Sequence, residues 1–455
     1  MHAETADRHG SGPARPVAPP GGEMTTARTL RLATPLMLAG ALTPILSLFD
    51  TWVVAVLPET YYLGAVAVGT MMFNYCYWAF AFLRMSTAGL AAQAWGARDP
   101  VEVKLVLVRG CVLALGLGGV IALAAALLVG PAAHALSSSP EVEENARLYI
   151  LARIWSVPAA FLNYALMGWF LAQRRMALST AIEVLRSAAN VALGIVIVRG
   201  LGYGVEGVAF AAALAEHVAL AVALVAGWRM WRADRSPWSW RQAFAWRPFR
   251  RVMEVSRDLF IRSQCLLLAF LGFTAGSGAF GDTTLAANAL LMNLYLLVSY
   301  ILSAFSQVAS ATVGSAVGAR DPDGVVRAIR VTTNVSVWAA VFCAAVMMLC
   351  GGVFIDALTP IESVRMTARE YLPYAAILPL VAVPSFQLDG AAIGAALTGL
   401  LRNTLVLALV IYAAGYWILP GWVGNHGVWI AFSAFMGARS IGFFVSLPTL
   451  RRAAG

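Results

Sequence analysis

The sequence predicts an all-α polytopic membrane protein in which twelve transmembrane helices form two six-helix lobes. Hydrophobic residues occupy 60% of the 455 positions and charged residues only 12%, which is about half the charged share of a soluble domain. A soluble fold of this size could not bury so much apolar surface. The composition therefore excludes water-soluble enzymes, nucleic-acid binders and disulfide-rich secreted domains.

Uncharged runs mark the individual spans. Residues 110–130, 331–353 and 405–424 carry no charged side chain, and about 20 such residues cross a hydrocarbon core at about 1.5 Å of rise each. Apolar runs between charges, prolines and glycines predict helices, in chain order, at residues 29–57, 62–92, 102–130, 144–172, 177–198, 204–230, 250–275, 283–314, 325–353, 366–395, 398–418 and 426–447.

The distribution of basic residues predicts the orientation of these spans. Residues 1–27 are polar and lack the apolar core of a signal peptide, so we expect a disordered cytoplasmic tail. Most Lys and Arg residues fall on the same side as this tail. The positive-inside rule then places both termini in the cytoplasm. The expected domains are lobes at 28–230 and 250–449, a cytoplasmic linker at 231–249 and a short tail at 450–455.

Two short motifs recur at one spacing. GARDP at 96–100 returns at 318–322, and ARLY at 146–149 returns as AREY at 368–371, so both offsets are 222 (318 − 96 and 368 − 146). Six spans per half is an even number, so the repeat is parallel, with its axis along the membrane normal. Two such bundles around a central cavity have the geometry of an alternating-access transporter.

Cysteine and histidine give no sign of a metal or cofactor. All five cysteines lie in apolar segments without metal-ligand spacing, and the histidines are scattered. A membrane-embedded enzyme would need nucleophile, acid, base or metal groups clustered at one depth, and the sequence offers no such cluster. We therefore expect no cofactor, no metal and no enzymatic activity.

Several segments resemble a known family. LFDT at 48–51, FLRMSTAGLAAQ at 82–93, RDLFIRS at 257–263, AANA at 286–289 and FQLDG at 386–390 resemble the MATE (multidrug and toxin extrusion) family in its DinF-like branch. The similarity covers nearly all of the chain after the tail. It implies an inner-membrane antiporter, expected as a monomer among membrane lipids, that exports amphipathic and often cationic small molecules against an inward flow of protons or sodium.

Ionisable side chains within spans are costly and indicate function. Asp50, Arg153 and Asn190 each lie about 7 to 9 residues from the outer end of their spans, hence at similar depth. A carboxylate there can bind and release a proton, and the amide can hydrogen-bond either form. The resemblance implies that the Asp and the Asn belong to an ion site in the N-terminal lobe. The alternative is a static Asp50–Arg153 pair that locks helices together.

A second group is expected at the substrate cavity or its gate: Asp389, Tyr164 and Arg262. The carboxylate would attract a cationic substrate or pair with a basic residue such as Arg402 or Arg84, and the tyrosine would stack on a flat cation. Elsewhere we expect structural pairs. Glu183 and Arg186 are three residues apart and face one side of a helix, and Arg84, Arg262, Arg439, Glu216 and His217 are expected to be structural partners.

Four positions depart from the family pattern. The family often has an Asp where this chain has Gly194, a Thr where it has Ala212, and acidic residues near Ser303 and Ser310. Sodium needs several oxygen ligands, commonly including carboxylates, so the thinned site favours protons as the coupling ion. The alternative function is a lipid-linked precursor flippase or metabolite exporter of the same superfamily. A flippase would favour several cavity arginines for pyrophosphate, and the sequence suggests few.

Overall fold

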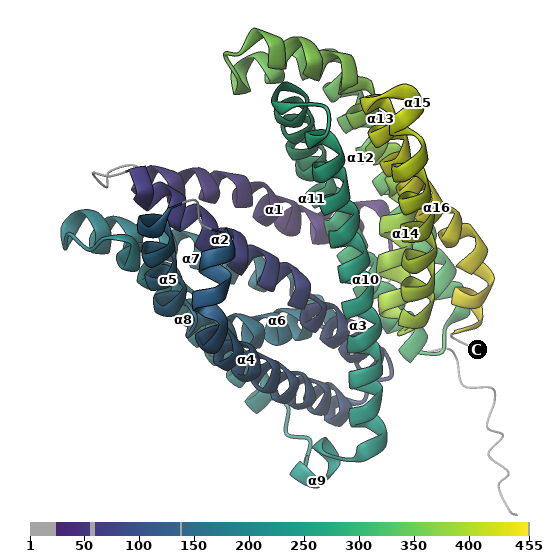
Figure 1. Cartoon of the computed structure of the whole chain (residues 1–455). Coiled ribbons are helices and arrows are strands. Elements are labelled where there is room, and N and C mark those ends of the chain that lie inside the picture. The colour runs from purple at the N-terminus through teal and green to yellow at the C-terminus, as the bar shows by residue number, and fades with distance from the viewer. Residues whose placement is uncertain (1–23, 55–59, 137–138, 454–455) are drawn as a thin grey trace, which may run out of the picture.

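The computed structural model describes residues 24–54, 60–136 and 139–453, and these ranges contain helices and no strands. The N-terminal lobe consists of α1 (Thr26–Val54), α2 (Thr60–Phe80), α3 (Phe82–Gly96), α4 (Pro100–Leu136), α5 (Pro140–Arg153), α6 (Ser156–Ala172), α7 (Met176–Gly194), the π-helical turn η1 (Ile195–Gly200) and α8 (Val205–Ala233). Figure 1 shows these helices, coloured purple to teal, grouped on one side of the molecule.

The short α9 (Trp240–Ala243) lies in the linker between the lobes. The C-terminal lobe consists of α10 (Trp246–Gly278), α11 (Asp282–Gly318), α12 (Pro322–Leu358), α13 (Glu362–Gly394), α14 (Thr398–Ile418), α15 (Pro420–Val423) and α16 (Asn425–Arg452). We call the end of the molecule that carries α9 the linker side (Figure 1).

The helices bear out the predicted membrane class. Within the described ranges, ten helices are long and apolar enough to cross a membrane, and the bent pair α5 and α6 makes eleven. α1, with 29 residues, has the length of a twelfth span. The span predicted at 144–172 is bent in the structure, because α5 and α6 meet at an angle of 49°. In an uninterrupted helix the ring of Pro158 would clash with the carbonyl of Ile154, which is the residue that follows the end of α5.

The GARDP repeat is a helix-to-helix turn used twice. Arg98 and Arg320 both adopt the left-handed region, with φ of 56° and 54°. After each arginine an aspartate amide donates to a carbonyl five residues back, over 3.1 Å from Asp99 and 2.9 Å from Asp321. Each aspartate side chain then caps the next helix by accepting from a backbone amide three residues on. Equivalent residues of the two halves thus form the same turn and the same helix cap, which confirms the parallel repeat.

A second pair of left-handed residues supports the same register. Arg174 and Ala396 have φ of 60° and 53°, and their numbers again differ by 222 (396 − 174). The amides that follow them, of Arg175 and Leu397, donate over 2.9 Å to carbonyls five residues back. The repeat therefore extends beyond the two sequence motifs that predicted it.

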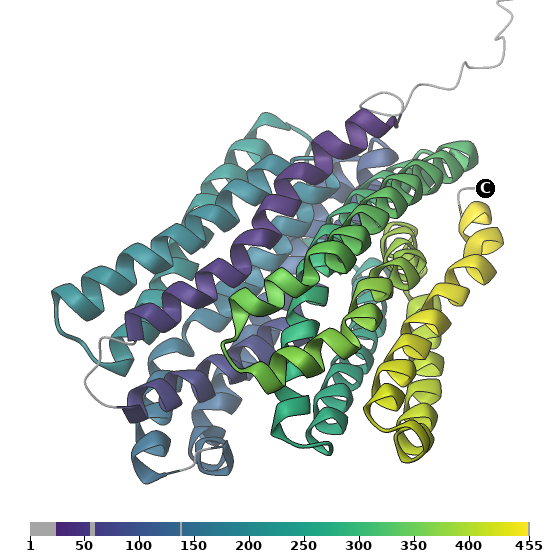
Figure 2. The same cartoon turned by 90° about the horizontal axis from the view of Figure 1, so that it is seen from above.

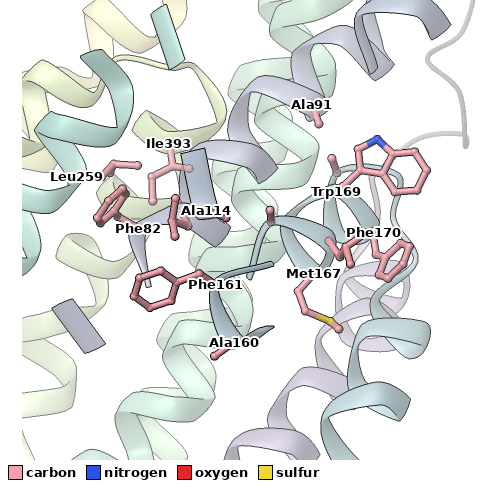
Figure 3. Close-up of a cluster of buried hydrophobic side chains, with 14 of the residues drawn as sticks. Phe82, Ala91, Ala114, Ala160, Phe161, Met167, Trp169, Phe170, Leu259 and Ile393 are labelled. Carbon is pink, nitrogen blue, oxygen red and sulfur yellow. The ribbon is translucent and has the colours of Figure 1, made fainter. Parts of the chain in front are cut away.

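The first helix of each lobe packs against the other lobe. α1 packs against α11 and α12 of the other lobe, while α10 packs against α3 and α2. Figure 2 shows α1, in purple, running beside the green helices of the C-terminal lobe. Buried apolar side chains continue across this boundary, and Figure 3 shows Leu259 and Ile393 of the C-terminal lobe against Phe82 of the N-terminal lobe.

Glycines bring the lobes into backbone contact on the linker side. A Cβ on Gly96 would lie 1.9 Å from the carbonyl oxygen of Ser315, and one on Gly318 would lie 1.9 Å from that of Gln93. These two contacts are related by the repeat, since 315 − 93 and 318 − 96 are both 222. Gln93 also donates over 2.9 Å to the carbonyl of Gly394 in the other lobe. The lobes are therefore closed against each other on the linker side.

Two buried basic residues of α4 hold the linker. Lys104 donates to the carbonyls of Asp234 and Ser236 over 2.8 and 3.1 Å, and Arg109 donates to those of Gln242 and Ala243 over 3.0 Å each. Burial raises the pKa of the Asp234 carboxyl, but the donors of Ser236 and Lys104 outweigh that effect and keep the pKa below its ordinary value. The linker is docked on the N-terminal lobe.

Candidate functional site

A cavity of about 400 Å³ lies between the two lobes, within the size range of small-molecule sites. Its wall is built from helices α1, α2, α3, α6, α7 and α8 on one side and α10, α11, α13 and α16 on the other. Apolar side chains such as Trp78 and Phe270 line it together with charged and hydroxyl groups. The rings of these two residues pack edge to face at 5.6 Å across the lobe boundary.

On the C-terminal lobe, one carboxylate is shared by two arginines. Asp389 of α13 accepts a hydrogen bond from Arg262 of α10, and it accepts another over 3.1 Å from Arg439 of α16. All three side chains are buried, at 3, 7 and 2% exposure in that order. The cluster has two positive charges against one negative. Arg262 and Arg439 also line the large cavity.

The prediction that Asp389 pairs with Arg402 or Arg84 was wrong. Arg402 donates over 2.8 Å to Asp258 instead, and the described structure contains no ion pair between Asp389 and Arg84. The sequence could not reveal this choice of partners, because the three clustered residues come from three spans that lie as far as 177 positions apart (439 − 262). Only the packing of α10, α13 and α16 brings them together.

On the N-terminal lobe the ratio is reversed, with one arginine between two carboxylates. Arg186 of α7 lies 2.6 Å from Glu183, which confirms the predicted local pair, and 3.2 Å from Glu216 of α8. Asn163 of α6 donates over 3.1 Å to the backbone carbonyl of Glu216. Helical spacing predicted the first contact but gave no sign of the second. His217 contacts the carbonyl of Ala213 in its own helix over 2.7 Å.

Arg84 of α3 differs from the other three arginines of the cavity wall. It lines the large cavity and a smaller pocket beside it, and in the described part of the chain its guanidinium group takes part in no hydrogen bond or ion pair. Its side chain is half-buried. Sequence reasoning placed Arg84 among the structural partners and missed its position on the wall.

The smaller pocket has a volume of about 60 Å³. Its lining includes Arg84, Arg262 and Asp389, and the hydrogen-bonding side chains Ser303, Ser306, Gln307 and Ser310 of α11. The Ser310 hydroxyl and the Gln307 carbonyl oxygen are buried without a hydrogen-bond partner in the described structure. Two of the four departures from the family pattern, Ser303 and Ser310, thus lie in this pocket.

The remaining predicted site residues fall into two places. Tyr164 of α6 lines the large cavity and donates over 3.3 Å to the carbonyl of Tyr77. Arg153, at the end of α5, is outside the cavity lining: it donates to the Tyr149 hydroxyl, and its guanidinium lies 4.8 Å from the ring centre of Phe73. Arg153 is therefore held by aromatic groups.

Asn190 of α7 is buried and has an interaction partner. The backbone of Asp50 belongs to α1, but its side chain lies outside the described residues. α1 and α7 pack against each other, so the two helices that carry these residues are neighbours. Gly194 is the last residue of α7 before the π-helical turn, and Ala212 lies in α8. In the described part of the chain, no group of three or more His, Cys, Asp or Glu side chains could hold a metal.

Comparisons with known proteins find relatives that match most of this chain. The MatE family model matches residues 35–196 and 260–418. The DNA damage-inducible protein F of Escherichia coli strain K12 is 34% identical over 411 residues, which cover 90% of this chain and 89% of that protein. A probable multidrug resistance protein NorM of Bradyrhizobium diazoefficiens is 28% identical, with 89% of each chain covered.

Solved structures share the fold. An outward-facing multidrug resistance MATE family transporter of the MOP superfamily aligns with a TM-score of 0.85 at 19% identity, over 94% of this chain and 96% of that one. A MOP superfamily transporter from Pyrococcus furiosus, described as having a binding pocket of reverse polarity, aligns with a TM-score of 0.82 at 19% identity, over 94 and 97% of the chains.

Proposed function

We propose that this chain, which belongs to the MATE family, is an inner-membrane antiporter that exports amphipathic small molecules in exchange for protons. It is a multi-pass membrane transporter and not an enzyme. The observation that carries the proposal is the 400 Å³ cavity between two repeat-related lobes that are closed against each other on one side. A cavity in this position is exposed to alternate sides when the lobes rock.

The linker side is the cytoplasmic side in this proposal. The excess of Lys and Arg residues in the loops on that side supports this orientation, together with cytoplasmic termini. The glycine contacts of Gly96 and Gly318 then close the cytoplasmic entrance, while the helices of the two lobes diverge away from it (Figure 1). With this orientation, we propose that the structure represents the outward-facing state of the cycle.

Proton coupling is assigned to Asp50 with Asn190 nearby. The packing of α1 against α7 supports this pairing, and the carboxylate supplies a group that binds and releases a proton. Arg153 on α5 is proposed to tune the site by its charge, held in place by Tyr149 and Phe73. The missing side chain at Gly194 and the methyl group of Ala212 remove oxygens that sodium would need, so we assign protons as the coupling ion.

A specific observation also favours the second candidate, the export of a lipid-linked precursor. Four arginines line the large cavity: Arg84, Arg186, Arg262 and Arg439. This is more than the sequence suggested, and guanidinium groups are suited to phosphate and pyrophosphate. Both candidates use the same cavity and the same rocking motion, and they differ in the size of the apolar body that accompanies the head group.

Asp50→Asn tests the coupling assignment. The amide forms hydrogen bonds but cannot release a proton, so we expect the variant to fold and to lose nearly all dye efflux driven by a pH jump in proteoliposomes. Asp282→Asn removes an exposed carboxylate at the start of α11 and should leave efflux unchanged. Unchanged efflux in Asp50→Asn would support the static pair with Arg153. Sodium-driven efflux by the wild type at constant pH would overturn proton coupling.

A further inference from the structure

The described charged groups of the cavity region carry a net positive charge. Four guanidinium groups face three carboxylates: Arg84, Arg186, Arg262 and Arg439 against Glu183 and Glu216 on the wall and Asp389 in the adjoining pocket. At neutral pH the sum is +1 (4 − 3). A wall with a net positive charge disfavours the binding of a cationic substrate, because like charges repel most strongly where water is excluded. It leaves one positive charge to be compensated by whatever binds.

The uncompensated charge can be located on the wall. Arg186 has two carboxylate partners, and Arg262 and Arg439 share one. Arg84 is the wall arginine whose side chain makes no hydrogen bond or ion pair in the described structure, although its charge acts through space on Glu183. A half-buried guanidinium with free donors facing a cavity is suited to binding an anion.

The small pocket supplies the remaining hydrogen-bonding groups for an anion. Arg84 and Arg262 both line it, together with Ser303, Ser306 and Ser310. The Nε of Arg262 and the hydroxyl of Ser310 are buried without a hydrogen-bond partner in the described part of the chain. A volume of about 60 Å³ is roughly twice the share of one water molecule in the liquid, which matches a carboxylate, sulfonate or phosphate group.

The large cavity provides for the rest of such a molecule. Its wall carries Trp78, Leu266, Phe270 and Tyr300. Aromatic and aliphatic side chains bury an apolar body well, while a few polar groups fix its orientation. The two compartments share Arg84, Arg262 and Ser303 as common lining residues, so one molecule can occupy both.

We infer that the substrates of this transporter are amphipathic compounds with an acidic head group, which binds between Arg84 and Arg262 while the apolar body lies against Trp78 and Phe270. The inference rests on the proposed export function, and it gives an acidic substrate class in place of the cationic one that the family resemblance implies. A free organic acid and a lipid with a phosphate head share this chemistry.

Equilibrium binding to the purified full-length protein tests the head-group preference without relying on transport. Three fluorescent probes share one aromatic body: dansylglycine is an anion, dansylcadaverine a cation and dansylamide neutral. We expect the anion to bind at least about tenfold more tightly than the cation, since a hydrogen bond to a charged group contributes about 1.5 kcal/mol or more. Tighter binding of the cation to the wild type would overturn the inference.

Variants of the two compartments locate the head group. Arg84→Gln should weaken dansylglycine binding about tenfold or more, and Arg84→Lys should retain most of the affinity. Ser303→Asp places a carboxylate between the arginines and should reverse the preference toward dansylcadaverine. Arg250→Gln removes an exposed arginine that pairs with Glu254 outside the cavity and should bind all probes as the wild type does. Melting curves verify that each variant folds, and unchanged dansylglycine binding by both Arg84→Gln and Ser303→Asp would refute the site.

Transport assays separate failure of this inference from failure of the proposed function. Efflux of dansylglycine driven by a pH gradient supports both. Efflux of dansylcadaverine alone would overturn the substrate class and leave proton-coupled export intact. Binding of dansylglycine without any proton-driven efflux would overturn the coupling and leave the substrate class intact. Competition by decanoate, compared with competition by farnesyl diphosphate, then assigns the acid to a free carboxylate or to a diphosphate on a lipid tail.

Discussion

The two lobes have the same backbone plan, but the charge clusters on the walls that face each other have opposite net charge. In the N-terminal lobe one arginine lies between Glu183 and Glu216. In the C-terminal lobe one carboxylate, Asp389, lies between Arg262 and Arg439. The first cluster has a net charge of −1 and the second of +1. The repeat has therefore kept the backbone and not the polarity of the cavity.

The reason lies in what each kind of residue does. Arg98 and Arg320, like Arg174 and Ala396, occupy left-handed turns that end one helix and start the next, so the direction of the chain depends on them. Side chains on the cavity wall determine no turn. They are free to differ as long as each buried charge has a partner.

The largest effect is expected where two buried cations depend on one anion. Asp389→Asn leaves Arg262 and Arg439 buried without a carboxylate, which should cost about 3 to 5 kcal/mol of stability. Thermal melting in detergent measures the loss, and Asp389→Glu is the matched control that keeps the charge. A melting temperature close to that of the wild type in Asp389→Asn would mean that the two arginines have another source of neutralisation.

An intermediate effect is expected at the contact that both lobes share. Gly96→Ala and Gly318→Ala each place a methyl group against a backbone carbonyl of the other lobe, and overpacking of this kind costs about 1 to 3 kcal/mol. Both variants should open the linker side. Ser315, which is fully buried there, provides a reporter: a Ser315→Cys thiol, in a background without other cysteines, should react roughly tenfold faster with an impermeant maleimide. If only one of the two substitutions increases the reaction rate, the two glycine contacts do not contribute equally to closing the linker side.

The smallest effect is expected where one cation has two anions. Glu216→Gln leaves Arg186 paired with Glu183 at 2.6 Å, and the hydrogen bond from Asn163 to the backbone carbonyl of residue 216 does not depend on the charge. The loss should be about 1 kcal/mol or less, measured by the same melting experiment. A loss as large as that of Asp389→Asn would contradict the distinction between the lobes.

The sequence by itself determined the membrane class, the parallel repeat and the family, because these depend on local properties: apolar runs long enough to span a bilayer, turn motifs at a fixed offset, and segments that resemble a family. It also determined the Glu183–Arg186 pair, since both residues lie on one helix at a spacing that puts them on the same face. The bend between α5 and α6 follows from Pro158 once the clash with residue 154 is considered.

Only the tertiary structure decided which charges meet. Asp389 had several basic residues within reach on the evidence of depth alone, and the crossing of α10, α13 and α16 selected Arg262 and Arg439. The same packing left Arg84 on the cavity wall and placed Ser303 and Ser310 beside it. A span predicts the depth of a residue but not the rotation of its helix about the axis, and that rotation, fixed by packing between helices far apart in the chain, determines the polarity of the cavity.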